Sequence, residues 1–223
     1  MKQKIQLLNT LSLLLWVFSA QAQVHSVGVV GGPSRSLINI KDGVGLPVNP
    51  QQNLVAGIQA SILLDKNWFL EPELLYRQNG YLVPRGGGVE TEVNFGYIAL
   101  PVKVALRVGN KLQGFASVGL APAFLLEAQA IGLLNGPLFG PIDNPNAVRK
   151  TYDIRVYTRS FDLSGLASIG LRYHFDSFAI SLEGRYNYSF TGFDEVIHYY
   201  AERQAFHKSW QMLLGVHYVL GER

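Results

Sequence analysis

The side chains best suited to chemistry in this sequence are charged residues that fall on one face of predicted β-strands. Successive side chains of a strand leave opposite faces, so residues two apart point the same way. By this rule one face collects four acids and four bases, namely Glu71, Glu73, Asp162, Glu183, Arg77, Lys103, Arg172 and Arg185. Buried charges are costly unless they are paired. We therefore expect a satisfied network that plugs a narrow interior.

Within that network we expect Lys103 and Arg185 to neutralise neighbouring carboxylates, and the partners we expect are Glu73 and Glu183. An eight-stranded barrel is only wide enough for side chains to fill it. The alternative interpretation is a narrow small-solute pore or proton path lined by the same eight residues, which measurable conductance would distinguish.

A second pair of residues raises the question of catalysis. His207 and Ser209 are two apart on the last predicted strand and share a face, with Glu202 in the adjoining loop. This set suggests a lipid-modifying enzyme, but nucleophilic catalysis also needs an orienting acid and an oxyanion site, and neither can be placed. We expect no catalytic residues. The sequence has no cysteine and no metal-ligand spacing of His, Asp and Glu, so we expect no metal and no cofactor.

Apolar residues recur at every second position along the chain, which is the period of β-strands. The clearest case is 178–191, where apolar and aromatic residues alternate with Ser, Glu, Arg and Asn. Eight such runs are predicted: 26–38, 54–64, 68–78, 96–107, 112–126, 160–173, 178–191 and 206–220. Four of them contain a proline: Gly31-Gly32-Pro33 interrupts the first run, and Pro72, Pro101 and Pro122 lie inside three others. A closed sheet tolerates proline poorly, and β-bulges could accommodate the last three.

The connections between these runs alternate in length. Tight turns are predicted at 65–67, 109–111 and 174–177, and long polar or Gly/Pro-rich stretches at 39–53, 79–91, 128–158 and 192–205. This alternation is typical of bacterial outer-membrane barrels. The sequence therefore predicts an all-β fold, an eight-stranded antiparallel up-and-down transmembrane β-barrel with both ends of the chain at the periplasmic side.

The composition of the two faces favours lipid on the outside. The polar face carries mainly small residues, glutamine and a few charges of both signs. The strands are long enough to cross a bilayer at a tilt. Aromatic residues gather near strand ends, as at membrane interfaces: Trp68, Phe69, Tyr173, Phe175, Phe178 and Tyr218 near the turns, and Tyr76, Phe95, Tyr97, Tyr188, Phe190, Phe206 and Trp210 near the loops. The alternative is a soluble periplasmic barrel whose apolar face lines a ligand cavity.

The first 22 residues have the pattern of an export signal. Lys2 and Lys4 precede an apolar run over 11–18, and Ala20-Gln21-Ala22 matches the site read by signal peptidase. We expect cleavage after Ala22, which leaves 23–223 as the barrel domain. Removing this segment lowers the formal charge from +3 to +1, so the sequence has no electrostatic footprint for nucleic acid.

Four stretches resemble the small PorT-like, porin-family outer-membrane barrels, a Gram-negative envelope family. They are Tyr97-Ile98-Ala99-Leu100-Pro101-Val102-Lys103, Glu71-Pro72-Glu73-Leu74-Leu75-Tyr76, Phe161-Asp162-Leu163-Ser164-Gly165 and Leu182-Glu183-Gly184-Arg185-Tyr186-Asn187-Tyr188. The resemblance implies an outer-membrane barrel without assigned activity, and some relatives are associated with protein secretion.

From this resemblance we expect a non-enzymatic barrel with a structural, surface-binding or secretion-associated role in the cell outer membrane. The expected partners are outer-membrane lipid, the barrel-assembly machinery, and secretion components or extracellular ligands that meet the long loops. The carboxyl-terminal Gly215, Tyr218 and Leu220 fit the core of a barrel-assembly signal, although a Gly-Glu-Arg tail follows them.

Overall fold

The computed structural model describes residues 23–40, 48–84, 90–133, 149–192 and 205–220. The predicted export signal at 1–22, the middle of each long loop and Glu202 lie outside the described residues. No helix in the described ranges is both long and apolar enough to cross a membrane.

The described residues form one antiparallel sheet that closes on itself. Its strands are β1 (Gln23–Ile40), β2 (Asn49–Asp65), β3 (Trp68–Pro84), β4 (Glu90–Ala99), β5 (Val102–Gly109), β6 (Leu112–Leu133), β7 (Arg149–Asp153), β8 (Phe161–His174), β9 (Phe178–Ser189) and β10 (Ala205–Val219). β4 and β5 are two parts of one strand, because both pair with β3 on one side and β6 on the other. β7 is a short addition to the end of β6.

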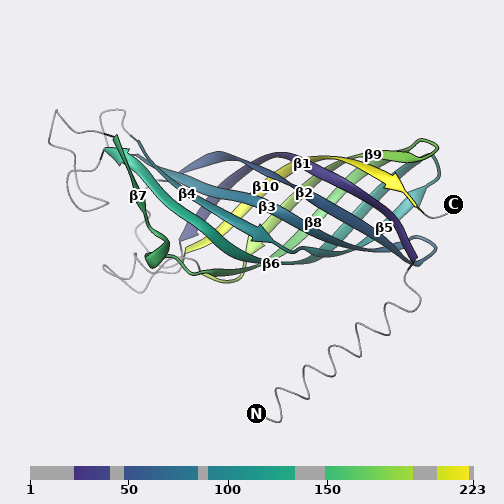
Figure 1. The fold of residues 1–223 in the computed structure, drawn as a ribbon, viewed down its shortest axis with the longest axis horizontal. Helices are drawn as coiled ribbons and strands as arrows, with labels where there is room; N and C mark the ends of the chain where they lie inside the picture. The colour runs from purple at the N-terminus through teal and green to yellow at the C-terminus, as the bar shows by residue number, and fades with distance from the viewer. Residues whose placement is uncertain (1–22, 41–47, 85–89, 134–148, 193–204, 221–223) are drawn as a thin grey trace, which may run out of the picture.

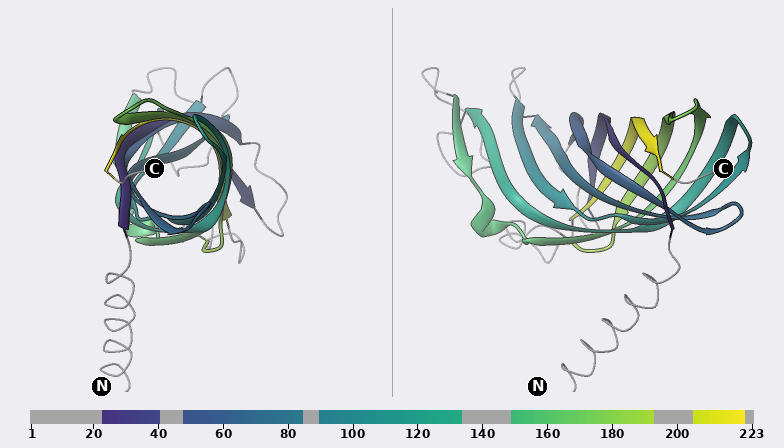
Figure 2. Two further views of the ribbon diagram at one scale, coloured as in Figure 1. Left: turned by 90° about the vertical axis from the view of Figure 1, so that its right-hand side faces the viewer. Right: turned by 45° about the vertical axis from the view of Figure 1, so that its right-hand side comes forward.

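Eight strands therefore make the ring, and pairing of β1 with β10 closes it. Seen end-on, the closed ring is plain in the left panel of Figure 2. β1 starts and β10 ends at the end that carries the tight turns (Figure 1), which we call the turn end. The opposite end, where β7 lies, is the loop end. The predicted eight-stranded up-and-down barrel is confirmed.

The two faces of the strands are divided as the alternation predicted. Along β9, Ser181, Glu183 and Arg185 are buried inside the barrel, whereas Phe178 and Leu182 lie on the outside and are exposed. Apolar side chains that would be buried in a soluble protein cover the exterior, so the apolar face points outward.

Four of the aromatic residues predicted for the interfacial belts are instead buried. Phe69, Phe95 and Tyr97 occupy inward positions of β3 and β4, and Phe206 is covered by Tyr188, with their rings stacked at 6.5 Å. The belt position predicted for Phe69, Phe95 and Tyr97 was wrong because closeness to a strand end fixes the height of a side chain but not its face, whereas Phe206 keeps an outward position on β10.

The prolines are accommodated by lost hydrogen bonds rather than by bulges. On both sides of Pro101 the pairing of the β4/β5 strand with β3 keeps one register, and Glu73 N–H still donates to the Pro101 carbonyl at 2.8 Å. Pro72 and Pro122 likewise leave the register of their ladders unchanged. The register shifts within the described strands lie elsewhere, between Val24 and Ser26, Pro50 and Val55, Leu63 and Asp65, and Gly96 and Tyr97.

The strands extend further toward the loop end than the sequence predicted. β3 runs to Pro84 and β4 begins at Glu90, so most of the loop predicted at 79–91 is strand. β6 continues to Leu133 and pairs with β7 inside the loop predicted at 128–158. The turn signals in these stretches are outweighed by ladder pairing with a neighbouring strand.

The interior contains polar and apolar levels. The inward positions of β3 run from Glu71 and Glu73 through Leu75 to Arg77, so an apolar position separates two charged ones. Leu75 belongs to a cluster of buried apolar residues that includes Val30, Val55, Tyr97, Ala99, Ala123 and Leu213. We call this set the apolar layer.

Candidate functional site in the barrel interior

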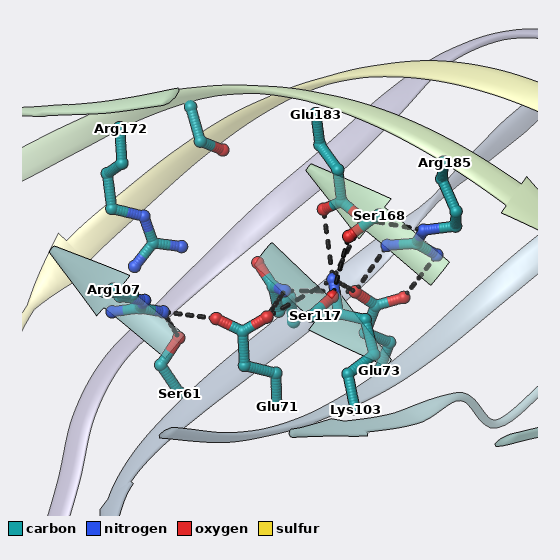
Figure 3. A network of polar contacts seen from close by, with 12 residues as sticks. Ser61, Glu71, Glu73, Lys103, Arg107, Ser117, Ser168, Arg172, Glu183 and Arg185 are labelled. Carbon is teal, nitrogen blue, oxygen red and sulfur yellow. Dashed lines mark hydrogen bonds and ion pairs between the residues drawn. The ribbon is translucent and has the colours of Figure 1, made fainter. Parts of the chain in front are cut away.

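Lys103 lies at the centre of the charged side chains between the turn end and the apolar layer. Its Nζ is 2.8 Å from Glu73 Oε1, 3.0 Å from Glu183 Oε2 and 3.3 Å from Glu71 Oε2. The side chain is fully buried. One ammonium group is thus shared by three carboxylates that come from β3 and β9 (Figure 3).

Arg185 joins two of those carboxylates from the opposite side. Its Nη1 and Nη2 each donate to one oxygen of Glu73 at 2.8 Å, a bidentate arrangement that fits the planar guanidinium. Its Nε donates to Glu183 Oε1 at 2.8 Å. Gln59 of β2 donates to Glu71 and Glu73 at 3.2 and 3.0 Å, which satisfies further carboxylate oxygens.

Arg107 completes this group, which we call the central cluster (Glu71, Glu73, Lys103, Arg107, Glu183 and Arg185). Its Nη2 forms an ion pair with Glu71 and a hydrogen bond to Ser61 Oγ at 2.6 Å. Its guanidinium lies over the ring of Phe69, 3.9 Å from the ring centroid. Sequence reasoning placed Arg107 on the inward face but left it out of the charged network. Its position four residues after Lys103, on the same face of the same strand, was the signal that could have included it.

Arg172 lies beside the central cluster without joining it (Figure 3). Its Nη2 is 3.2 Å from His217 Nε2, and it makes no ion pair with a carboxylate among the described residues. Its buried Nε and Nη1 have no hydrogen-bond partner in the described part of the chain. Four acids and five bases therefore occupy the interior, and Arg172 is the base without a matching acid.

Arg77 and Asp162 form a separate group, the loop-side pair, on the other side of the apolar layer. Arg77 Nη2 is 2.9 Å from Asp162 Oδ2. Asp162 also accepts hydrogen bonds from the hydroxyl groups of Ser164, Ser189 and Thr191. Of the eight charged residues predicted from the sequence, five thus lie in the central cluster, two form the loop-side pair, and Arg172 stands alone.

The residues considered for lipid chemistry are enclosed in the barrel. His207 and Ser209 are both buried on the inward face of β10. His207 Nε2 is 3.5 Å from the Tyr97 hydroxyl, and Ser209 Oγ accepts a hydrogen bond from Asn187 at 3.4 Å. No group of three or more His, Asp or Glu side chains in the described ranges is placed to hold a metal ion.

The arrangement is suited to holding charge in place. Every carboxylate of the central cluster has at least two polar partners, and each lies in a region from which solvent is nearly absent. Buried ion pairs are tolerated when geometry is good and the remaining lone pairs are satisfied. Along β3 the apolar layer lies between the central cluster and the loop-side pair, whereas along β9 the inward side chain between Arg185 and Ser189 is the polar Asn187.

Comparison with known proteins gives a consistent result. A family model described as outer membrane protein beta-barrel domain matches residues 21–195. The solved structure of OprG from Pseudomonas aeruginosa is similar, with a TM-score of 0.52 and 10% sequence identity over 90% of this chain and 98% of that chain. Neisserial surface protein A is similar with a TM-score of 0.47 and 10% identity over 87% of this chain and 97% of that chain. A comparison with curated proteins gives no match. At such low identity the likeness to OprG shows the fold alone.

Proposed function

Because this chain belongs to the outer membrane β-barrel domain family, we propose that it is a plugged, non-conducting and non-enzymatic barrel that displays its loop end at the cell exterior. The observation that supports this most is the filling of the interior. The central cluster occupies the lumen from several strands at once, and the apolar layer lies above it.

A continuous polar path would be needed for solutes or protons to pass. In the apolar layer, the side chains of Leu75, Tyr97 and Leu213 are each no more than 2% exposed. An ion that meets this layer would lose its hydration without gaining polar partners, and that transfer is costly. On β9 and β10 the inward side chains between the two charged groups, Asn187, Ser209 and Gln211, are polar but almost fully buried. This favours a plugged barrel over the narrow channel.

The non-enzymatic part of the proposal is supported by enclosure of the candidate pair. A lipid substrate approaches from outside the barrel, whereas His207 and Ser209 point into it. A His207→Ala or Ser209→Ala variant should leave the lipid composition of the outer membrane unchanged.

Planar-bilayer recording of the folded full chain tests the plugged interior. We expect no single-channel conductance from the wild-type protein. The double variant Leu75→Ser/Leu213→Ser makes the apolar layer polar, and it should show channel openings. Steady conductance from the wild-type protein would overturn the proposal, and the double variant shows that the assay detects an opened barrel.

We also infer which partners the barrel meets. Tyr218 and Leu220 lie on the outer face at the end of the last strand and are more than half exposed, which supports recognition by the barrel-assembly machinery. The loop end is the surface available to secretion components or extracellular ligands, because loops on a rigid scaffold are the usual place of binding. A PorT-like role in secretion would be seen as loss of a secreted protein when the gene is deleted.

A further inference from the structure

The outer wall of the barrel has an irregularity near the loop end. Between Pro50 and Val55 the pairing of β2 with β3 shifts, so four residues of β2 oppose three of β3. There the hydroxyl of Ser36, from β1, donates to the Gly80 carbonyl at 2.7 Å and accepts from the Gly80 N–H at 2.8 Å. β1 thus replaces the ladder bonds that β2 gives up.

This irregularity lets a β2 side chain reach across β3. Gln51 Nε2 donates to Asn94 Oδ1 of β4 at 2.5 Å, although β3 lies between these two strands. Gly80 permits the crossing, because a Cβ atom at that position would collide with Gln51 Oε1.

A pocket of about 250 Å³ lies beside this crossing. Its lining includes six amide side chains: Gln51, Gln52, Asn53, Gln78, Asn94 and Gln129. One carboxylate, that of Glu127, completes the polar set, and the described lining contains no Lys or Arg. The side chains of Gln52 and Gln129 make no hydrogen bond to another described residue, so their donors and acceptors are available to a ligand.

The composition of the lining selects a class of ligand. Each amide offers one acceptor oxygen and two N–H donors, which matches hydroxyl groups that both donate and accept. The absence of a cation from the described lining disfavours phosphate or carboxylate ligands. Most small-molecule pockets are largely apolar, so a wall of amides suits a neutral polyhydroxylated compound, that is, a saccharide.

The height of the pocket indicates where that saccharide comes from. Between the pocket and the turn end, the outer face of the strands is apolar, and Leu74, Phe124 and Leu126 are all exposed there. Tyr76 marks the change, and its hydroxyl donates to Glu127 Oε1 at 2.8 Å. Tyrosine at such a boundary is typical of the membrane–water interface. The pocket therefore lies on the outer wall just above the lipid-facing band, at the level of lipid headgroups.

We propose that this amide-lined pocket binds the sugar headgroup of a glycolipid of the outer leaflet. The glycolipid's acyl chains would lie against the apolar exterior below Tyr76 while its sugar hydroxyls meet the amides above. This inference rests on the outer-membrane location and is independent of whether the lumen conducts.

The test measures the affinity of an uncharged diglycosyl diacylglycerol for the folded full chain in phospholipid nanodiscs, because this glycolipid presents sugar hydroxyls without phosphate or carboxylate groups. The readout is the midpoint of thermal unfolding at increasing glycolipid fraction. Gln129→Leu removes an amide that makes no hydrogen bond within the described protein, so folding should be preserved. We expect it to weaken binding of the uncharged glycolipid about tenfold, in line with the loss of one or two hydrogen bonds. Asn94→Leu should act in the same direction.

A matched control comes from the same strand. Gln113→Leu makes the same chemical change on the inward face of β6 at the turn end, where it also removes the 3.0 Å hydrogen bond with His174 Nε2. Because the site is distant from the pocket, the apparent affinity of this variant should equal that of the wild-type protein. Equal affinities for the wild-type protein and Gln129→Leu would overturn the proposal. Titration with the free disaccharide of that glycolipid forms a separate arm. Binding of the disaccharide together with no response to the glycolipid would also overturn the proposal, because the ligand would then be a soluble saccharide.

Discussion

The central cluster and the loop-side pair place charge in the same barrel in different ways. In the central cluster, Lys103 is shared by three carboxylates and Glu73 by two bases. In the loop-side pair, Arg77 meets one carboxylate, and three hydroxyl groups provide the other partners of Asp162. In a shared network the free energy of each buried charge depends on several other charges. In a pair supported by hydroxyl groups it depends mainly on one opposite charge and on neutral hydrogen-bond donors. The two groups should therefore respond differently to the loss of one member.

Replacing Lys103 should have the largest effect. Lys103→Met leaves three buried carboxylates near one another with only Arg185 and Arg107 to compensate them. We expect the free energy of unfolding to fall by about 3–5 kcal/mol, the usual cost of breaking a buried ionic group by removing one partner. Urea titration of the folded protein in detergent, followed by heat-modifiable gel mobility, measures this loss. A loss below 1 kcal/mol would mean that the cluster is hydrated and its charges are screened.

Replacing Asp162 should have a smaller effect. Asp162→Asn keeps a side chain that can accept from the neighbouring hydroxyl groups, and it removes only the charge opposite Arg77. We expect a loss of about 1–3 kcal/mol, because the buried Arg77 guanidinium loses its carboxylate but keeps the Ser164 hydroxyl and the new amide oxygen as polar partners. The same urea titration provides the comparison, and a loss equal to that of Lys103→Met would remove the distinction between the two groups.

Replacing Arg172 should have the smallest effect. It has no carboxylate partner among the described residues, so Arg172→Met removes a buried cation without leaving an unpaired anion. We expect the free energy of unfolding to change by less than about 1 kcal/mol, because the avoided cost of burying the charge offsets the lost hydrogen bond. Arg185→Met is the matched control on the neighbouring strand, and it should cost several times more.

The sequence predicted the fold and the faces of the strands, because both follow from the two-residue period. It predicted which charged residues point inward but not how they divide into groups. Strand alternation places Arg77 and Glu73 on the same inward face. That they fall into two separate charged groups, with Leu75 between them on β3, could be predicted only with the register of the neighbouring strands. The pairing of Arg107 with Glu71 and Ser61 also depends on register, since the three residues lie on three different strands, β5, β3 and β2.

The wrong predictions have physical causes of the same kind. The stretch at 79–91 is rich in Gly and Pro, yet β3 and β4 pair through most of it because each gains a complete ladder from the other. The prolines needed no bulge, because their missing N–H groups cost single hydrogen bonds while the register was kept. Strand length and the tolerance of proline depend on the neighbouring strand, so the local sequence alone does not predict them.

The length of β6 has a consequence for how the protein meets large molecules. The strand contains 22 residues, whereas about 9–11 residues suffice for a tilted strand to cross the hydrocarbon of a bilayer. Leu126 still belongs to the lipid-facing band and Gln129 lies at the headgroup level, so the last four residues of β6 (130–133), at a rise of about 3.3 Å per residue, carry the barrel wall roughly 10 Å beyond that level. The end of β6 and its neighbour β7 therefore stand clear of the lipid headgroups, where a partner too bulky to reach the bilayer can make contact.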